Sequence, residues 1–149
     1  MTRLQFPGPD ADVPRPTQLS APYWAGCARG VVLYQRCAAC GRPADVPSWR
    51  CRWCGGADLS WRPSAGRGAI YSWSVVWRPR SPGLEVPYGV VIADMDEGFQ
   101  LLSNLGDCDT EALSVGTRVQ VVFRHLSDDV GLPLLVLEGS AAADVSVER

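Results

Sequence analysis

Residues 37–55 read CAACGRPADVPSWRCRWCG, and this stretch decides the fold of the first half of the chain. Cys37 and Cys40 form one Cys-x-x-Cys pair, Cys51 and Cys54 form a second, and ten residues separate the pairs. Four thiolates at this spacing can surround one divalent ion tetrahedrally, with metal–sulfur bonds of about 2.3 Å. The sequence therefore predicts a metal ribbon.

Each cysteine pair ends in a glycine, in CAACG and CRWCG. A glycine can take a positive φ, which lets the turn fold back so that backbone amides point at the sulfur atoms. We expect Zn2+ as a structural cofactor; iron, which the same knuckles bind in electron carriers, is the alternative. Four protein ligands fill the coordination shell, which leaves no open position for catalysis on the metal.

Two further cysteines, Cys27 and Cys108, lie outside this pattern. Free cysteines are usually small buried apolar residues, and we expect that role here. A nucleophilic cysteine would need a histidine partner, and the single histidine, His125, lies in a strand-like run. The sequence therefore assigns no catalytic residue.

The charge is divided unevenly along the 149 residues. Residues 1–80 carry 11 Arg and 4 Asp, and residues 81–149 carry 3 Arg and 12 acidic residues, for a net charge of −2. This asymmetry indicates two modules with different surfaces, although a solvated charge pattern is the alternative. No apolar run approaches the about 20 residues of a membrane helix, and the start lacks a secretory apolar core. We expect a cytoplasmic protein.

Arginine and tryptophan alternate around the knuckles. Such residues can hold a phosphate or stack on a nucleic-acid base, but they are also typical of protein interfaces. A ribbon without a core of its own has exposed aromatic side chains to cover, so we favour docking on a partner protein. The candidate interface comprises Tyr23, Trp24, Trp49 and Trp53.

From residue 68 the hydrophobic period changes to two, which is typical of strands. In GAIYSWSVVW, Tyr71, Trp73, Val75 and Trp77 share one face of the expected first strand. Further strands are expected in 87–96, 98–105, 117–125 and 132–138, with a helical turn in 109–116 between the third and fourth. This is the plan of an OB-fold, a partly open five-stranded barrel. The Pro/Gly-rich segment 78–87 is expected to be the loop between the first two strands.

The segment SAPYWAGCARG, residues 20–30, predicts one short helix before the ribbon. Ser20 can cap it, Pro22 is tolerated in the first turn, and Gly30 can end it. The expected class is thus mostly β. The expected order is an N-terminal tail (1–16), the helix (17–30), the zinc ribbon (31–66), the OB-fold (67–139) and a C-terminal tail (140–149).

The stretches PYWAGCARGVVLYQRCAACG and WRPSAGRG, together with the second knuckle and a DEG turn, carry a family resemblance over residues 20–138. The chain resembles the acyl-CoA-associated proteins that join a rubredoxin-like zinc ribbon to a C-terminal OB-fold, formerly a domain of unknown function. It departs from the family pattern in VPSWRCRWC, which lacks a Pro-Pro-Arg run, and in Leu132-Pro133-Leu134-Leu135, where a Leu-Pro-x-Phe motif is usual.

The resemblance implies a non-catalytic partner of thiolase-superfamily enzymes, including lipid-transfer-type aldolases that shorten steroid side chains. It implies a two-plus-two heterotetramer and an acyl-CoA bound by the partner. If CoA is bound, Arg67 is the first candidate to contact its phosphates, followed by Arg62 and Arg78. The alternative role of Arg67 is a structural link between the ribbon and the barrel.

A nucleic-acid-binding module is the alternative function, because OB-folds and zinc ribbons both occur in such proteins. The basic ribbon favours it, whereas the acidic barrel half disfavours it. Electron transfer through an iron-loaded ribbon is the third hypothesis.

Overall fold

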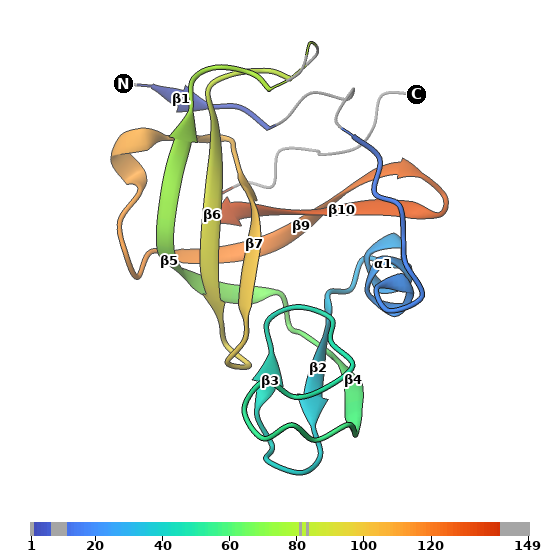
Figure 1. The fold of residues 1–149 in the computed structure, drawn as a ribbon. Helices are drawn as coiled ribbons and strands as arrows, with labels where there is room; N and C mark the ends of the chain where they lie inside the picture. Colours follow the sequence, from blue (N-terminus) through green and yellow to red (C-terminus); the bar gives the residue numbers. More distant parts are fainter. Residues whose placement is uncertain (1, 7–11, 81, 83, 141–149) are drawn as a thin grey trace.

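The computed structural model describes residues 2–6, 12–80, 82 and 84–140, which form a β-barrel, a small metal ribbon beneath it and one helix at their side (Figure 1). In chain order the elements are β1 (Arg3–Leu4), α1 (Ala21–Ala28), β2 (Leu33–Cys37), β3 (Pro43–Ala44), β4 (Leu59–Pro63), β5 (Arg67–Val76), β6 (Tyr88–Met95), β7 (Gln100–Leu105), β8 (Cys108–Asp109), the 3-10 helix η1 (Thr110–Ala112), β9 (Arg118–Ser127) and β10 (Val130–Leu137).

The five longer strands of the second half close into a barrel in the order β10-β7-β6-β5-β9. Antiparallel pairs join all neighbours except β10 and β7, which meet in parallel at Leu135 and Leu105. The short helix η1 lies between β7 and β9, where the sequence predicts a helical turn. The mostly β class and the five-stranded OB-fold are therefore confirmed.

Along β9, Val119 is fully buried, and Val121 and Phe123 pack against the core, which fits the period of two that predicts a strand over 117–125. The alternation along β5 is interrupted by a β-bulge between Ile70 and Ser72. Ile70 fills the core, and the extra residue, Tyr71, is exposed. The single aromatic face expected for β5 is therefore wrong at Tyr71, because a bulge shifts the register by one residue and moves a side chain out of the stripe. It is also wrong at Trp77, which is exposed and follows the end of β5.

Part of the segment expected to be an N-terminal tail is folded. Arg3 pairs with Asp109 and Leu4 with Cys108, so that β1 and β8 form a two-stranded sheet at one end of the barrel. Leu4 is fully buried in the barrel core. A strand of two residues is too short to carry a periodic signal, which is why the pattern did not predict it. The C-terminal tail expected over 140–149 lies, after Ser140, outside the described residues.

Helix α1 begins directly after Ser20 and has Pro22 in its first turn. The Ser20 side chain does not cap the helix; its Oγ instead accepts a hydrogen bond of 2.9 Å from the Thr17 backbone N–H. Gly30, with φ +77°, follows the C-terminal end, as predicted. The helix packs on β10 so closely that a Cβ on Gly131 would lie 2.3 Å from the Cys27 carbonyl oxygen.

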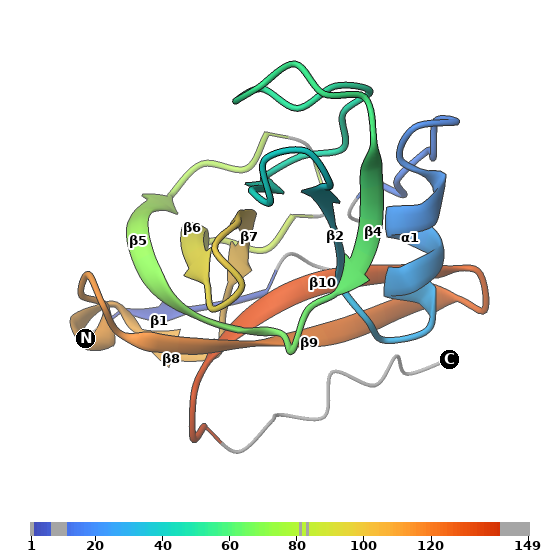
Figure 2. The same ribbon diagram turned by 90° about the horizontal axis from the view of Figure 1, so that it is seen from below.

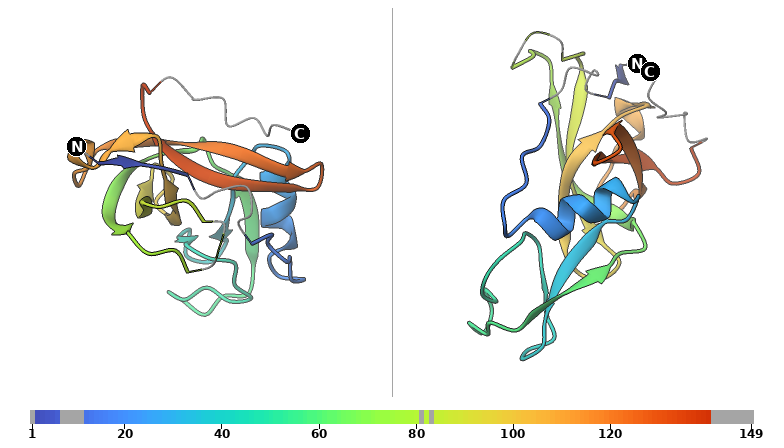
Figure 3. Two further views of the ribbon diagram at one scale, coloured as in Figure 1. Left: turned by 90° about the horizontal axis from the view of Figure 1, so that it is seen from above. Right: turned by 90° about the vertical axis from the view of Figure 1, so that its right-hand side faces the viewer.

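The ribbon is a three-stranded sheet in the order β3-β2-β4, seen beside the open end of the barrel in Figure 2. The ribbon contacts the barrel at the turn between β6 and β7. In this turn the Glu97 carboxylate accepts hydrogen bonds from two residues that follow β4, from Ser64 Oγ (3.0 Å) and from the Ala65 backbone N–H (2.6 Å). The rings of Tyr34 and Phe99 stack across the same junction, 4.7 Å between centroids. The right-hand view of Figure 3 shows α1 lying where the ribbon and barrel meet.

Within the described residues, no helix is long and apolar enough to cross a membrane. The one α-helix has 8 residues, whereas a bilayer requires about 20.

Because Leu4 is fully buried, Leu4→Ala should lower the free energy of unfolding by about 2–5 kcal/mol. The exposed Leu102 provides the matched control, and Leu102→Ala should change stability by less than about 0.5 kcal/mol. Urea denaturation monitored by tryptophan fluorescence measures both. Equal stabilities of the two variants would show that β1 does not belong to the core.

Candidate metal centre and partner surface

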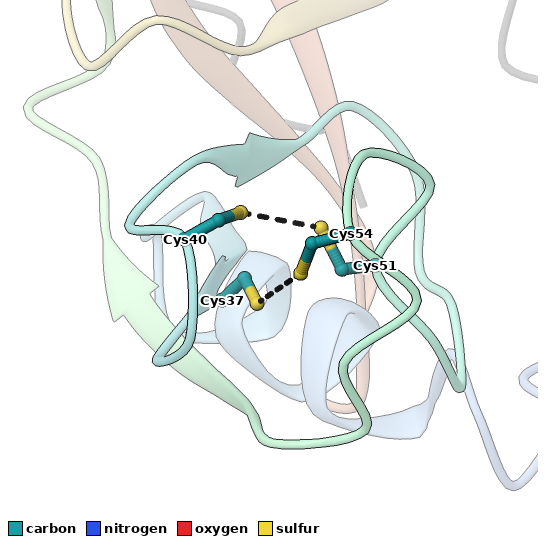
Figure 4. Close-up of side chains that lie close together, drawn as sticks. All are labelled: Cys37, Cys40, Cys51 and Cys54. Atoms are coloured by element: carbon teal, nitrogen blue, oxygen red, sulfur yellow. Dashed lines mark hydrogen bonds between the residues drawn. The ribbon is translucent and has the colours of Figure 1, made fainter.

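The sulfur atoms of Cys37, Cys40, Cys51 and Cys54 all lie within 4.8 Å of one another. Figure 4 shows the four side chains gathered in one place between the two knuckles. The Cys37 and Cys54 sulfurs are 3.6 Å apart, as are those of Cys40 and Cys51. Four sulfurs at about 2.3 Å from a central ion would be separated by about 3.8 Å, so the cluster fits a tetrahedral metal ion. The four cysteines predicted from the sequence are therefore brought together as one candidate metal site.

The two knuckles have the same backbone structure. In the first, the Cys37 N–H donates to the Arg42 carbonyl oxygen (3.0 Å); in the second, the Cys51 N–H donates to that of Gly56 (2.8 Å). The glycine after each pair donates a backbone hydrogen bond of 2.8 Å to the first cysteine of that pair: the Gly41 N–H donates to the Cys37 carbonyl oxygen, and the Gly55 N–H donates to the Cys51 carbonyl oxygen. Both glycines have positive φ, +72° and +75°, which is why a glycine ends each motif.

Backbone amides point at two of the sulfurs, as expected. In the second knuckle the Trp53 N–H donates to Cys51 Sγ and the Gly56 N–H to Cys54 Sγ, both at 3.4 Å. Such donors favour the thiolate form and orient it toward a metal. Cys37 and Cys51 are buried and Cys40 and Cys54 exposed, so one side of the cluster faces solvent.

An arginine supports each knuckle, a feature that sequence reasoning missed. Arg36 precedes Cys37 and donates from Nη1 to the Gly41 carbonyl oxygen at 2.7 Å. Arg50 precedes Cys51 and donates from Nη1 to the Gly55 oxygen at 3.3 Å. The signal was present, because the motif repeated in the chain is Arg-Cys-x-x-Cys-Gly rather than Cys-x-x-Cys-Gly alone.

The remaining cysteines are buried and unreactive. Burial raises the pKa of the Cys27 thiol to about 11, and burial likewise raises the pKa of the Cys108 thiol to about 11. Both thiols are therefore protonated near neutral pH, and a protonated thiol is a poor nucleophile. Burial also raises the pKa of Tyr23, which is hydrogen-bonded to Cys27 one helical turn away. The expected role as buried apolar residues fits both cysteines.

A second carboxylate, that of Asp45, connects the ribbon to the barrel in addition to that of Glu97. Its Oδ2 accepts a hydrogen bond of 2.9 Å from Nη1 of Arg52, inside the second knuckle. Its Oδ1 accepts another of 2.9 Å from the backbone N–H of Gln100, the first residue of β7. The position of the second knuckle is thereby linked to the first barrel residue after the β6–β7 turn.

Three of the four predicted interface aromatics lie around the junction of helix and ribbon. Tyr23 and Trp24 meet edge to face, 5.1 Å between ring centroids, and line a cavity of about 280 Å³. The exposed Trp49 lines an adjoining hollow of about 380 Å³, and Trp61 borders both. Trp53 lies apart at the second knuckle.

The exposed Trp53 ring has two arginines over it. The guanidinium carbons of Arg42 and Arg52 lie 4.8 Å and 4.5 Å from the ring centroid. Each contact stabilises the cation over the π face and holds the indole in place. This Arg–Trp–Arg stack gives the ribbon an exposed surface that is both aromatic and basic.

The three arginines proposed for CoA phosphates are exposed but do not converge. Arg67 begins β5 and forms an ion pair of 3.2 Å with Glu138, whereas Arg78 follows the opposite end of β5 and Arg62 lies on β4. The Arg67–Glu138 pair adjoins Arg118, which donates to both Asp96 carboxylate oxygens at 2.8 Å. Hydrogen bonding from Arg118 lowers the pKa of Asp96. Arg67 thus belongs to a charge network on the barrel.

The architecture, a four-cysteine ribbon joined to an OB-fold, defines a class of two-part proteins, and comparison with known proteins identifies the family. Residues 61–124 match the family model described as ChsH2, C-terminal OB-fold domain. A DUF35 domain-containing scaffold protein of Methanothermobacter thermautotrophicus is 31% identical over 98 residues, covering 63% of this chain and 72% of that protein. The chain belongs to the DUF35 family.

Two further similarities extend beyond the OB-fold. The chain matches the solved structure of an Ltp2-ChsH2(DUF35) aldolase with a TM-score of 0.74 and 27% identity, over 83% of this chain and 98% of that one. A probable enoyl-CoA hydratase alpha subunit of Thermomonospora curvata is 31% identical over 103 residues, which are 69% of this chain. The match spans only 32% of that protein's length, so the similarity concerns one part of the longer protein.

The cluster geometry predicts one bound metal ion per chain, lost on removal of a single ligand. Cys54→Ser should abolish stoichiometric metal content and unfold the ribbon, because four ligands hold a segment with little core. Elemental analysis by mass spectrometry measures the metal. Cys108→Ala is the control: it removes a buried thiol outside the cluster and should keep one ion per chain. Full metal content and solubility of Cys54→Ser would refute the assignment.

Proposed function

We propose that this chain is a non-catalytic accessory subunit that binds and stabilises a thiolase-like acyl-CoA-processing enzyme and helps to shape its acyl-CoA site. The observation that carries the proposal is the structural match to the Ltp2-ChsH2(DUF35) aldolase, in which 98% of the matched aldolase chain is covered. The names of two relatives, a DUF35 scaffold protein and a hydratase alpha subunit, support the role of a partner subunit in acyl-CoA metabolism.

The cysteine chemistry supports a binding role. The four clustered thiolates would occupy all positions of a tetrahedral ion, and the two other thiols are buried and protonated. We assign the metal as structural Zn2+, which prefers four thiolates in this geometry; iron is the alternative. A colourless protein containing zinc would exclude the electron-transfer hypothesis.

The partner we propose is a thiolase-superfamily enzyme, either a thiolase or a retro-aldolase of lipid or steroid side-chain degradation, in a two-plus-two heterotetramer. Tyr23, Trp24 and Trp49 offer it an aromatic surface at the helix–ribbon junction, and Trp53 extends that surface to the second knuckle. Aromatic side chains of this kind dominate the energetics of protein interfaces.

A nucleic-acid-binding module is the alternative, and the Arg42–Trp53–Arg52 stack is the observation that favours it. Against it, Arg52 is paired with Asp45, and Arg36 and Arg50 donate to carbonyl oxygens of the knuckles. Retention of single-stranded DNA that falls steeply with salt would support the alternative.

The accessory role predicts that the purified chain turns over no acyl-CoA and that the tagged chain recovers a thiolase-like enzyme in equal amounts from its own host. Affinity purification with mass spectrometry identifies the enzyme, and size-exclusion chromatography with light scattering then gives the stoichiometry. Cys54→Ser is the control, since an unfolded ribbon should recover little enzyme. Acyl-CoA turnover by the isolated chain would contradict the proposal.

If Arg67 contacts CoA phosphates, Arg67→Ala should raise the KM of the complex for acyl-CoA by at least about tenfold and leave kcat unchanged. Glu138→Gln removes the ion-pair partner and keeps the arginine, so it should leave KM unchanged. Steady-state kinetics of both reconstituted complexes separates the two roles. Unchanged KM in both variants, with lowered stability of Arg67→Ala, would assign Arg67 to the barrel alone.

A further inference from the structure

The cavity of about 280 Å³ lies where helix α1, the ribbon and strand β7 meet. Figure 3 shows these three parts converging beside the barrel. The wall is mainly aromatic, with contributions from all three parts: Tyr23, Trp24, Tyr34, Trp61 and Phe99. Because the stacked pair Tyr34–Phe99 and the edge-to-face pair Tyr23–Trp24 fix four of these rings, the cavity is preformed.

The carboxylate, amide and hydroxyl groups of the wall are already engaged within the chain. Gln35 accepts from the Ser48 N–H (2.7 Å) and donates to its carbonyl oxygen (3.1 Å). The Asp45 carboxylate accepts from Arg52 and Gln100.

The three hydroxyl groups also have partners. The Tyr23 hydroxyl is hydrogen-bonded to Cys27, the Tyr34 hydroxyl accepts from Arg36, and the Ser20 hydroxyl is hydrogen-bonded to that of Thr17. Apart from the indole N–H groups of Trp24 and Trp61, a polar occupant would find few side-chain groups to bond, and it would lose its own hydration, which costs free energy. The chemistry of the wall selects an apolar occupant.

The mouth of the cavity is also apolar. Val46 and Leu102, which line it from the ribbon and from β7, are 70% and 66% exposed. The exposed Trp49 lines the adjoining hollow on the other side of Trp61. A preformed pocket within exposed apolar side chains is the arrangement of an interface hot spot, in which a partner's anchor residue enters and the rim excludes water.

We propose that this cavity is the anchor point of the partner enzyme and receives one or two apolar side chains from its surface. The inference rests on the proposed function and names where, and by what chemistry, the enzyme is held. The volume of about 280 Å³ lies at the lower end of the about 300–1,000 Å³ of small-molecule pockets, so the apolar chemistry of the wall, and not the volume, favours side chains as the occupant. The described lining contains a carboxylate and no arginine, so it offers no cation to the phosphates of a CoA.

The test places a charge on the rim without disturbing the core. Leu102→Glu should weaken the complex with the co-purified enzyme by at least about tenfold, because the complex would desolvate an unpaired carboxylate. Val115→Glu is the matched control: Val115 is 70% exposed, does not line the cavity, and should leave affinity unchanged. Calorimetry or surface plasmon resonance with the full chain gives the dissociation constants, and thermal denaturation checks that both variants are folded.

A second variant fills the cavity instead of charging its rim. Ala44 lines the cavity from β3, and Ala44→Phe should weaken the same complex without adding charge. Wild-type affinity of both Leu102→Glu and Ala44→Phe for the enzyme would overturn this inference alone. Failure of the wild-type chain to bind any acyl-CoA enzyme would overturn the proposed function and this inference with it.

Two other occupants would also overturn the inference. Binding of decanoyl-CoA to the isolated wild-type chain, abolished by Ala44→Phe, would make the cavity an acyl-chain site. Self-association of the wild-type chain in sedimentation velocity, abolished by Leu102→Glu, would make a second copy of the chain the occupant.

Discussion

The rest of the structure depends on the convergence of four cysteine sulfurs on one point. The ribbon sheet has strands of 5, 2 and 5 residues, too little to bury a core of its own, so the closed cluster must hold the knuckles in place. Contacts from the knuckles then fix the position of the ribbon relative to the barrel. Arg52 of the second knuckle bonds Asp45, Asp45 bonds the first residue of β7, and β2, which ends at Cys37, stacks Tyr34 on Phe99. The wall of the aromatic cavity is assembled by these same contacts.

The fold could be predicted where its signals are local. The knuckles are encoded within 19 residues, and the period-two pattern of Val119, Val121 and Phe123 lies within one strand. The pairing of β1 with β8 was not predictable, because it joins two strands of two residues each that lie far apart in the sequence, at Arg3–Leu4 and Cys108–Asp109. The bulge in β5 was missed for the same reason: the residue that Ile70 meets is on β6, and only the pairing shows which aromatic side chain leaves the core face.

The candidate site was predictable in its residue types but not in its arrangement. The cysteine ligands followed from spacing, whereas the grouping of Tyr23 and Trp24 with Trp61, and the isolation of Trp53, depend on how α1 lies against the ribbon. The arginines show the limit most clearly. The sequence left two roles open for Arg67, a contact to CoA and a structural link, and gave no sign of its ion pair with Glu138, which is more than seventy positions away and directly follows β10.

The basic character of the first half has a structural explanation that bears on function. Four thiolates and one divalent ion together carry a net charge of about −2. Arg36 and Arg50 lie next to ligands of this cluster and donate to the glycine carbonyl oxygens of the knuckles, and Arg52 stacks on Trp53 within the second one. Their positive charges therefore offset the negative cluster in addition to holding the turns, as outer-shell groups of metal sites commonly do. Three of the arginines that make this half basic are thus engaged within the ribbon, which supports our proposal that apolar and aromatic contact, rather than charge, holds the partner.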